Sequence, residues 1–340
     1  MPGMTTATNR VVRWAGARRL TVEDAPFPDA RPDQVVVQVH GVGICGTDLS
    51  VWRGQVGRAR PGVVLGHEFG GTVAGVGSEV AEWREGQAVA IDPNDGCGDC
   101  SHCREGSLGA CARRKLLGVD LDGGLCRYLA LDPAQLVAAD PCTEPHRLAL
   151  AEPLAVAVRA CERARIAAGS RVGVIGAGSI GTACVVRARD LGAASVTVVE
   201  AAPDRRADAA RRGIDAMAPD ELRPDRWDAV VDTVGIGATA ASAAEATQPG
   251  GTVCVVGLAP ELTPPLGQRL VREEITLTGS FCYSRAQLHE ATRLLARIDP
   301  ADLPVRVLDS LDHAPEAFLA LADGALGPYK TVFRPEGAQR

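Results

Sequence analysis

The stretch that decides the fold of half of this chain reads Val174-Ile175-Gly176-Ala177-Gly178-Ser179-Ile180-Gly181. It follows an apolar, strand-like segment and opens a segment with helical composition. In a G-x-G-x-x-G turn the first glycine permits a tight bend, the second lets a phosphate approach, and the third lets helix and strand pack closely. Backbone N–H groups at the helix start then face the anion. We therefore predict a dinucleotide site formed by Gly176, Gly178, Ser179, Ile180 and Gly181.

The segments around this turn predict an α/β fold with two domains. From about residue 153 onward, apolar strands alternate with helices, which is typical of a parallel sheet covered on both faces. The predicted strands are 171–175, 195–200, 229–232, 252–257 and 275–279, and the helices are 154–166, 179–191, 203–212 and 238–247. The first half has short strands separated by Gly and Pro, at 35–39, 71–76 and 88–91, and this pattern predicts a mostly β, barrel-like domain.

Glu200 ends the strand that follows the glycine turn, about 20 residues on, where a carboxylate can accept hydrogen bonds from ribose hydroxyls. It would repel a 2′-phosphate, so we expect NAD rather than NADP. Arg205 lies near enough in sequence to reach such a phosphate, which keeps NADP open. Other strand ends supply further candidate cofactor contacts, although a glycine there can simply end a strand: Asp232, Gly257, Gly279 and the following Ser280.

Four cysteines are spaced C-x2-C-x2-C-x7-C: Cys97, Cys100, Cys103 and Cys111. Four thiolates in so short a stretch suit the tetrahedral all-sulfur coordination of a structural zinc site. Such a zinc contributes about 10–16 kcal/mol of apparent binding energy. We predict that the remaining thiols outside any metal site are buried and inert: Cys126, Cys142, Cys161, Cys184, Cys254 and Cys282.

Composition limits the classes of partner. The chain has 340 residues, and 36 basic against 42 acidic side chains give a formal net charge of −6. The absence of a basic cluster argues against nucleic acid and anionic membranes as partners. No apolar run suits a secretory signal or a membrane-spanning helix, so we expect a cytoplasmic protein with reduced thiols.

Three further motifs complete the pattern: Gly43-Ile44-Cys45-Gly46-Thr47-Asp48, Gly66-His67-Glu68-Phe69-Gly70-Gly71 and Ala151-Glu152-Pro153-Leu154-Ala155. In this order, with the cysteine loop and the glycine turn, they resemble the zinc-dependent medium-chain dehydrogenase/reductase family. The resemblance implies a GroES-like catalytic domain (1–153 and 287–340) with a zinc lobe (about 92–115), and a Rossmann domain (154–286). It also implies a homodimer or homotetramer.

The same resemblance implies a catalytic zinc held by Cys45, His67, Glu68 and Glu152, with the two glutamates both bound or one alternating with water. Thr47 matches the hydroxyl residue that passes the substrate proton onward, although threonine also suits a helix cap. Ser50 stands where many relatives carry the histidine that completes this relay. The proton route is therefore open, and a zinc-bound water with Glu68 or Glu152 as base is the alternative.

We expect a zinc-dependent oxidoreductase that transfers a hydride between NAD and a small secondary alcohol or ketone. Glu152, in place of the second cysteine of liver-type alcohol dehydrogenases, favours a polyol, cyclitol, sugar or hydroxy-amino substrate. Threonine-type and simple secondary alcohol dehydrogenases are the nearest rivals. A non-catalytic cofactor-binding relative, and a lyase or imine reductase, are rivals from other classes. Substrate recognition by Trp52, Arg53, Phe281 and Tyr283 is open, since Trp52 could equally lie in the core.

Overall fold

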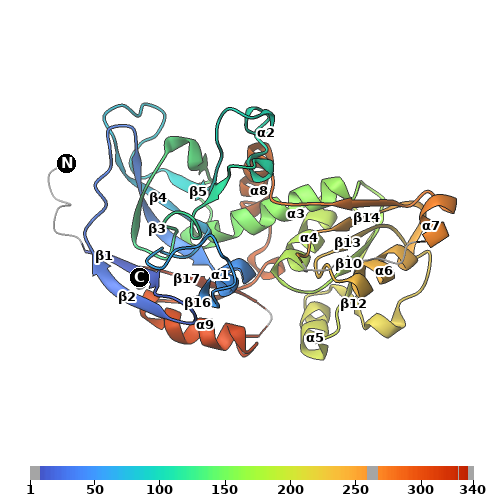
Figure 1. The fold of residues 1–340 in the computed structure, drawn as a ribbon. Helices are drawn as coiled ribbons and strands as arrows, with labels where there is room; N and C mark the ends of the chain where they lie inside the picture. Colours follow the sequence, from blue (N-terminus) through green and yellow to red (C-terminus); the bar gives the residue numbers. More distant parts are fainter. Residues whose placement is uncertain (1–7, 259–266, 328, 336–340) are drawn as a thin grey trace.

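The computed structural model of the chain describes residues 8–258, 267–327 and 329–335 (Figure 1). Figure 1 shows a β-rich half on the left and, on the right, a half in which helices flank a sheet. The predicted α/β class is confirmed by this arrangement. Within the described ranges, none of the helices combines the length and the apolar character needed to cross a bilayer.

The right-hand half is built on a six-stranded parallel sheet in the order β12-β11-β10-β13-β14-β15. The first strand of this sheet in the sequence is β10, which lies near its centre. The chain then adds β11 and β12 on one side of β10 and crosses to β13 on the other side. Ligands bind in parallel sheets at such a reversal of strand order, and the glycine turn leaves β10 there. The strands span Arg171–Ile175 (β10), Ser195–Val199 (β11), Asp215–Met217 (β12), Trp227–Asp232 (β13), Thr247–Val255 (β14) and Thr276–Gly279 (β15).

Helices cover both faces of this sheet. One apolar core joins α3, α4 and α8 to one face, and a second core packs α6 on the other. Gly173 of β10 leaves room for Trp227, since a Cβ there would lie 2.4 Å from the indole ring. The helices span Ala151–Arg163 (α3), Ser179–Asp190 (α4), Pro203–Arg211 (α5), Gly237–Ala246 (α6), Gly267–Arg272 (α7) and Arg285–Leu295 (α8).

The left-hand half is built on a seven-stranded sheet in the order β16-β17-β3-β4-β5-β9, with β8 also paired to β3. Strands β16 and β17 come from the end of the chain and join β3 from its beginning. These strands span Val35–Gly43 (β3), Glu68–Val76 (β4), Ala88–Ile91 (β5), Tyr128–Leu131 (β8), Leu136–Ala138 (β9), Val305–Leu308 (β16) and Lys330–Phe333 (β17).

Smaller elements complete the β-rich half. The hairpin of β1 and β2 packs beside the large sheet, and β6 pairs with β7 at the base of the cysteine loop. The bounds are Asn9–Trp14 (β1), Leu20–Ala25 (β2), Gly46–Trp52 (α1), Asn94–Asp95 (β6), Ser101–Arg104 (α2), Lys115–Leu116 (β7) and Ala314–Ala322 (α9). One apolar core contains both Ala90 of the left-hand half and Val174 of the right-hand half. The packing therefore does not mark where one domain ends, and the domain bounds stay a prediction.

Several details differ from the sequence-based expectation. Thr247 starts β14 and does not end α6. Trp52 lies in the core, 2 % exposed, with its ring 6.2 Å from that of Phe318, so it cannot line a substrate site. Cys142 is exposed and Cys282 is half-buried, whereas the other four thiols predicted to be inert are buried.

Candidate active site

Three side chains with metal-binding chemistry meet where β3, α1 and β4 come together. Cys45 follows β3 and caps α1, His67 precedes β4, and Glu68 is the first residue of that strand. The pairing of β3 with β4 places Gly43 opposite Glu68. The Cys45 sulfur, one His67 nitrogen and one Glu68 oxygen all lie within 4.8 Å of one another. Three of the four predicted catalytic zinc ligands are therefore brought together.

Asp48, which we did not predict as a site residue, fixes this cluster. Its buried carboxylate accepts hydrogen bonds from the backbone N–H of Cys45 (2.8 Å) and of Gly66 (3.1 Å). The same group lies 3.3 Å from Nδ1 of His67. A carboxylate only accepts, so Nδ1 carries a proton, and Nε2 is the ring nitrogen that could bind a metal. An acidic residue three positions after a helix cap is the sequence signal that could have identified it.

The charge of His67 responds to the same neighbours. Burial acts to lower the pKa of His67, but Asp48 and Cys45 outweigh it, so the pKa is raised well above its usual value. Without a cation the imidazole therefore favours its protonated form. A metal ion bound at Nε2 would take the place of that proton.

Lys330, from β17, faces Glu68 inside the protein. Its Nζ lies 2.6 Å from Oε2 of Glu68 and donates to Oε1 at 2.8 Å and to the carbonyl of Ile44 at 3.1 Å. Burial lowers the pKa of Lys330, but Glu68 and Cys45 raise it by more. Lys330 therefore carries a positive charge beside the cluster.

Glu152 lies in the first turn of α3, near the cluster but outside the group of three whose ligand atoms are mutually close. Part of its side chain stays accessible, yet burial of the carboxyl raises the pKa of Glu152 to about 7, an effect that His67 opposes and Glu68 reinforces. The hydroxyl of Tyr283 is buried beside it and forms no well-aligned hydrogen bond with any residue that the structure describes. Burial and the Glu152 carboxylate together raise the pKa of Tyr283 well above its usual value.

The two predicted relay residues lie on α1. Thr47 Oγ1 is 3.9 Å from the Cys45 sulfur, so its hydroxyl borders the cluster. Cys45 occupies the cap position and Thr47 lies inside the helix, so the alternative in which Thr47 caps the helix is wrong. Ser50 donates its hydroxyl to the Gly46 carbonyl at 3.1 Å, within its own helix. A relay through Ser50 stays a prediction.

The donors at this cluster suit zinc. Thiolate, imidazole and carboxylate are the ligands that catalytic zinc sites combine, with one position left for water or substrate. In the described part of the chain, Glu68 Oε2 is buried without a well-aligned hydrogen bond. The Lys330 ammonium lies 2.6 Å from that oxygen, so a metal ion bound by Glu68 would share the carboxylate with Lys330.

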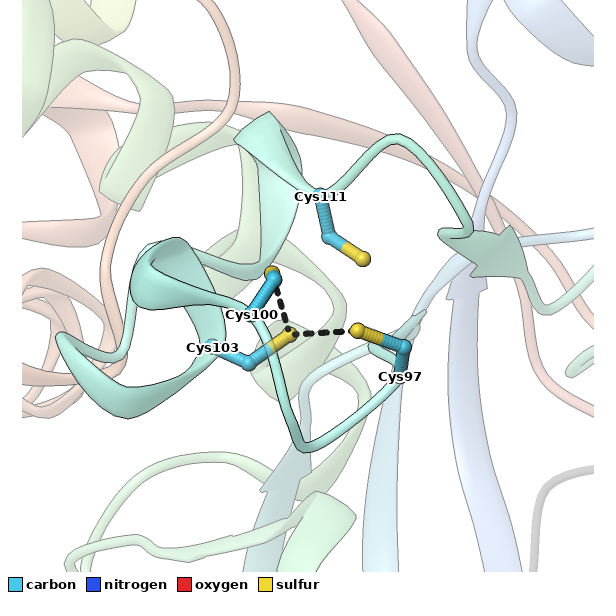
Figure 2. Close-up of side chains that lie close together, drawn as sticks. All are labelled: Cys97, Cys100, Cys103 and Cys111. Atoms are coloured by element: carbon cyan, nitrogen blue, oxygen red, sulfur yellow. Dashed lines mark hydrogen bonds between the residues drawn. The ribbon is translucent and has the colours of Figure 1, made fainter.

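The cysteine loop provides a second metal site. Sulfur atoms of Cys97, Cys100, Cys103 and Cys111 lie within 4.8 Å of one another and point into one space (Figure 2). Cys103 Sγ is 3.8 Å from Cys97 Sγ and 3.5 Å from Cys100 Sγ. Tetrahedral zinc with Zn–S bonds of about 2.3 Å requires sulfurs about 3.8 Å apart. All four thiols are free, so the loop fits a structural zinc.

Two of these thiols differ in acidity. A backbone hydrogen bond at Cys97 is the main cause that lowers the pKa of Cys111 to about 7, whereas burial raises that of Cys103 to about 11. Since the thiolate is the metal ligand, Cys111 is ready to bind zinc near neutral pH. The pKa values of Cys97 and Cys103 are raised, so metal binding at this loop would release protons from these two thiols.

The glycine turn has the geometry that the pattern predicts. Gly176 has φ +97°, a conformation that other residues rarely adopt. A Cβ on Gly181 would lie 1.9 Å from the Gly176 carbonyl oxygen, so α4 can approach β10 only with glycine there. A Cβ on Gly178 would meet nothing within 4 Å, which leaves open space at the start of α4. Ser179 and Ile180 open the helix beside it.

Glu200 stands at the end of β11 and points at the turn. Its Oε2 accepts from the Ala177 backbone N–H at 2.8 Å, and its Oε1 accepts from Ala202 at 2.9 Å. Arg205 Nη1 is 3.9 Å from Oε2, with nearly half of its side chain exposed. Arg206 instead donates to the carbonyls of Glu200 and Ala201. The Glu200 carboxylate and the partly exposed Arg205 guanidinium thus lie together at the place where we expect the ribose.

A cavity of about 410 Å³ connects these residues. Small-molecule sites commonly have volumes of about 300–1,000 Å³. Gly176, Gly178, Glu200 and Arg205 line it, and the lining residues that we did not predict include Thr233, Ile236 and Thr239. These three lie in the loop after β13 and in the first turn of α6, where the sequence carries no recognisable motif.

The remaining strand ends have structural roles of their own. Asp232 is buried and accepts from Val234, Gly235 and the Thr239 hydroxyl. A Cβ on Gly257 would lie 2.2 Å from the backbone of Val234, so the two loops require glycine to meet. The Gly279 carbonyl accepts from Arg163, and Ser280 has a buried hydroxyl with no partner in the described residues. Cofactor contacts at Asp232, Gly257, Gly279 and Ser280 stay predictions.

Comparison with known proteins supports the family resemblance that the sequence motifs carry. Residues 31–141 match the alcohol dehydrogenase GroES-like domain, and residues 179–297 match the zinc-binding dehydrogenase family. A sorbitol dehydrogenase of Bombyx mori is 34 % identical, over 78 % of this chain and 82 % of its own length. An L-galactonate-5-dehydrogenase of Escherichia coli K12 is 30 % identical, over 85 % of this chain and 88 % of its own.

A solved structure agrees at the level of the fold. A zinc-binding dehydrogenase from Sinorhizobium meliloti, bound to NADP, superposes with a TM-score of 0.87 at 27 % identity, over 97 % of this chain and 100 % of that one. The chain therefore belongs to the zinc-dependent medium-chain dehydrogenase/reductase family. Its relatives lie in the branch that includes the sorbitol dehydrogenases. The predicted GroES-like and Rossmann folds, and an oxidoreductase of the alcohol dehydrogenase type, are confirmed at this level.

Proposed function

We propose that this protein oxidises a secondary alcohol of a polyol or sugar acid to the ketone, with NAD as the preferred cofactor. The observation that carries the proposal is the cluster of half-buried Cys45 with buried His67 and Glu68, which lies beside Glu152. The names of two relatives, sorbitol dehydrogenase and L-galactonate-5-dehydrogenase, support a polyhydroxylated substrate. The reverse reaction, ketone reduction, uses the same groups.

When bound, zinc supplies the Lewis acidity that lowers the pKa of a neighbouring hydroxyl, and NAD supplies the hydride acceptor. Cys45, His67 and Glu68 would hold the metal, with Asp48 keeping His67 in the required tautomer. Glu152 would either complete the ligand set or act as a base. Its pKa of about 7 suits a group that takes and returns a proton at neutral pH. Because the Ser50 hydroxyl is bonded within its own helix, we favour Glu152 as the proton acceptor.

The cofactor would occupy the cavity at the glycine turn. Backbone N–H groups at the start of α4 would face the pyrophosphate, and Glu200 would accept from the adenosine ribose. Support for NAD comes from the inward-pointing Glu200 carboxylate, which would repel a 2′-phosphate. Arg205 could offset this repulsion, and one neighbour of the same fold binds NADP.

The test is a substrate panel followed by the absorbance of the reduced cofactor. We expect turnover of sorbitol or galactitol-type polyols with NAD, weaker turnover with NADP, and little with propan-2-ol or L-threonine. Activity should disappear on chelation and return with added zinc. Failure of every alcohol in the panel to reduce either cofactor would refute the proposal.

A further inference from the structure

The segment that leads from β15 into α8 packs against the cysteine lobe. The backbone N–H of Arg285 donates to the Gly106 carbonyl at 3.1 Å. A Cβ on Gly109 would lie 2.4 Å from the Cβ of Cys282, so the Cys282 side chain packs directly on the Gly109 backbone. This segment also carries Tyr283, whose side chain lies beside Glu152. The lobe and the catalytic cluster therefore border the same short stretch, 281–285.

Arg114 extends from the base of the lobe toward this stretch. Its guanidinium carbon lies 5.4 Å from the centre of the Phe281 ring, and its Nη1 donates to Oδ1 of Asn94 at 2.7 Å. Asn94 is itself held by the buried Asp92, to which it donates from both its side chain and its backbone. Asn94 therefore holds one nitrogen of the guanidinium, and the Phe281 ring covers one of its faces.

Cys282, next to Phe281, is within electrostatic reach of both Arg114 and groups of the catalytic cluster. Burial raises the pKa of Cys282 to about 11; Arg114 and His67 oppose this shift, while Glu152 and Asp92 add to it. Phe281, which the Arg114 guanidinium contacts and which precedes Cys282 in the chain, is 47 % exposed, and this is unusual for so large an apolar side chain.

Arg114 is a half-buried cation whose charge is not neutralised by direct contact. In the ranges that the structure describes, no carboxylate forms an ion pair with it, and Asp92 acts on it only from a distance. Neighbouring arginines differ, since Arg113 pairs with Asp99 and Arg58 with Asp120. Arginine offers a planar fork that suits carboxylate and phosphate groups.

We propose that Arg114 binds an anionic end group of the substrate, a carboxylate or a phosphate, so that acidic polyols are preferred to neutral ones. This inference rests on the proposed polyol oxidation. The Phe281 ring would cover the carbon chain of the substrate, with Arg114 at its far end and the reacting hydroxyl at the cluster. The two relatives compared above bear names of a neutral polyol and of an acid, so family membership alone does not decide the matter.

The experiment compares galactitol, L-galactonate and galactitol 1-phosphate, which share a hydroxyl configuration and differ at one end. For the wild type we expect kcat/KM to be highest for one of the two acidic compounds. A higher value for L-galactonate would indicate a carboxylate as the bound group, and a higher value for galactitol 1-phosphate would indicate a phosphate. In Arg114→Gln, kcat/KM for that compound should fall about 10- to 100-fold, mainly through KM, while that for galactitol changes less than about twofold. For Arg114→Lys, kcat/KM for the acidic compound should lie between the values for the wild type and for Arg114→Gln, because lysine keeps the charge and loses the planar guanidinium.

Arg19→Gln is the matched control, because it removes one exposed positive charge from the β1–β2 hairpin. Arg19→Gln should leave kcat/KM for all three compounds unchanged. Thermal unfolding should show that each variant is folded. If Arg114→Gln is unstable, Arg114→Lys provides the same comparison.

Equal losses for galactitol and the acids would overturn the inference and make Arg114 a structural residue. A wild type that prefers galactitol would overturn it as well. In both cases the proposed oxidation of polyols would remain supported. If none of the three compounds reduces NAD or NADP, the proposed function fails instead.

Discussion

Lys330 and Glu68 form a buried ion pair at the edge of the predicted zinc site, with side chains that are 6 % and 1 % exposed and atoms 2.6 Å apart. The partners are 262 residues apart in sequence. A buried charge that loses its partner is strongly destabilising, by about 3–5 kcal/mol. Strand β17, late in the chain, therefore neutralises a carboxylate that the first half of the chain contributes to the predicted metal site.

Lys330→Met should destabilise the metal-free protein by about 3–5 kcal/mol, because it leaves Glu68 charged and unpaired. With zinc bound, the same substitution should cost less, since the metal cation then neutralises the carboxylate. Denaturant unfolding of wild type and variant, with chelator and with excess zinc, measures both differences. An equal cost under the two conditions would mean that Glu68 does not face the metal.

Glu200→Ala should relax the preference for NAD. Loss of the carboxylate removes both the ribose acceptor and the repulsion of a 2′-phosphate, so the ratio of kcat/KM for NAD to that for NADP should fall at least about tenfold. Arg205→Ala is the opposing control, and it should weaken NADP more than NAD. Unchanged discrimination in Glu200→Ala would show that another residue contacts the ribose.

Cys103→Ser should cost the protein one zinc and much of its stability, because the loop depends on four sulfurs. Structural zinc contributes about 10–16 kcal/mol of apparent binding energy, so even partial loss should lower the midpoint of thermal unfolding by many degrees. Metal analysis should fall from two zinc ions per chain to one. Cys142→Ser, at an exposed thiol outside the loop, is the control. If the zinc content of the two variants is equal, the loop is not a metal site.

Stability at acid pH should depend on Asp208, on α5. Burial acts to raise the pKa of Asp208, but hydrogen bonds from Tyr329 and Arg212 lower it below the usual 3.8. A carboxylate with a lowered folded pKa stabilises the protein above its unfolded pKa, and this contribution is lost as the pH falls through the folded pKa.

The difference in unfolding midpoint between wild type and Asp208→Asn should therefore be constant near neutral pH and shrink below about pH 4. Denaturant unfolding of both proteins across this range provides the measurement. Tyr329→Phe, which removes one donor at 2.7 Å, should give a smaller change of the same sign. A difference that grows as the pH falls would contradict the assignment.

Much of the fold could be predicted because continuous apolar strands and a glycine turn are local signals. The strand at 171–175 and the helix that begins at Ser179 are found where they were expected. The strands β12 and β16 were not predicted, since both are short and only partly buried, and their pairing depends on segments far away. Helix α7, six residues long, has no buried face that would have marked it.

The site was predictable where ligand residues lie within motifs, as Cys45, His67 and Glu68 do. Asp48 and Lys330 were missed because their roles arise from contacts that the chain forms only when folded. Lys330 in particular is a single lysine in the last strand, with no motif around it. Trp52 was ambiguous for the same reason, since its neighbours in sequence do not show that Phe318 packs on it.

Metal analysis and turnover of Cys45→Ala, measured on the same sample, test the central claim most directly. The account predicts one zinc ion per chain in the variant against two in the wild type, with the cysteine lobe still loaded and polyol oxidation lost. Two zinc ions per chain in Cys45→Ala, or turnover equal to that of the wild type, would contradict it.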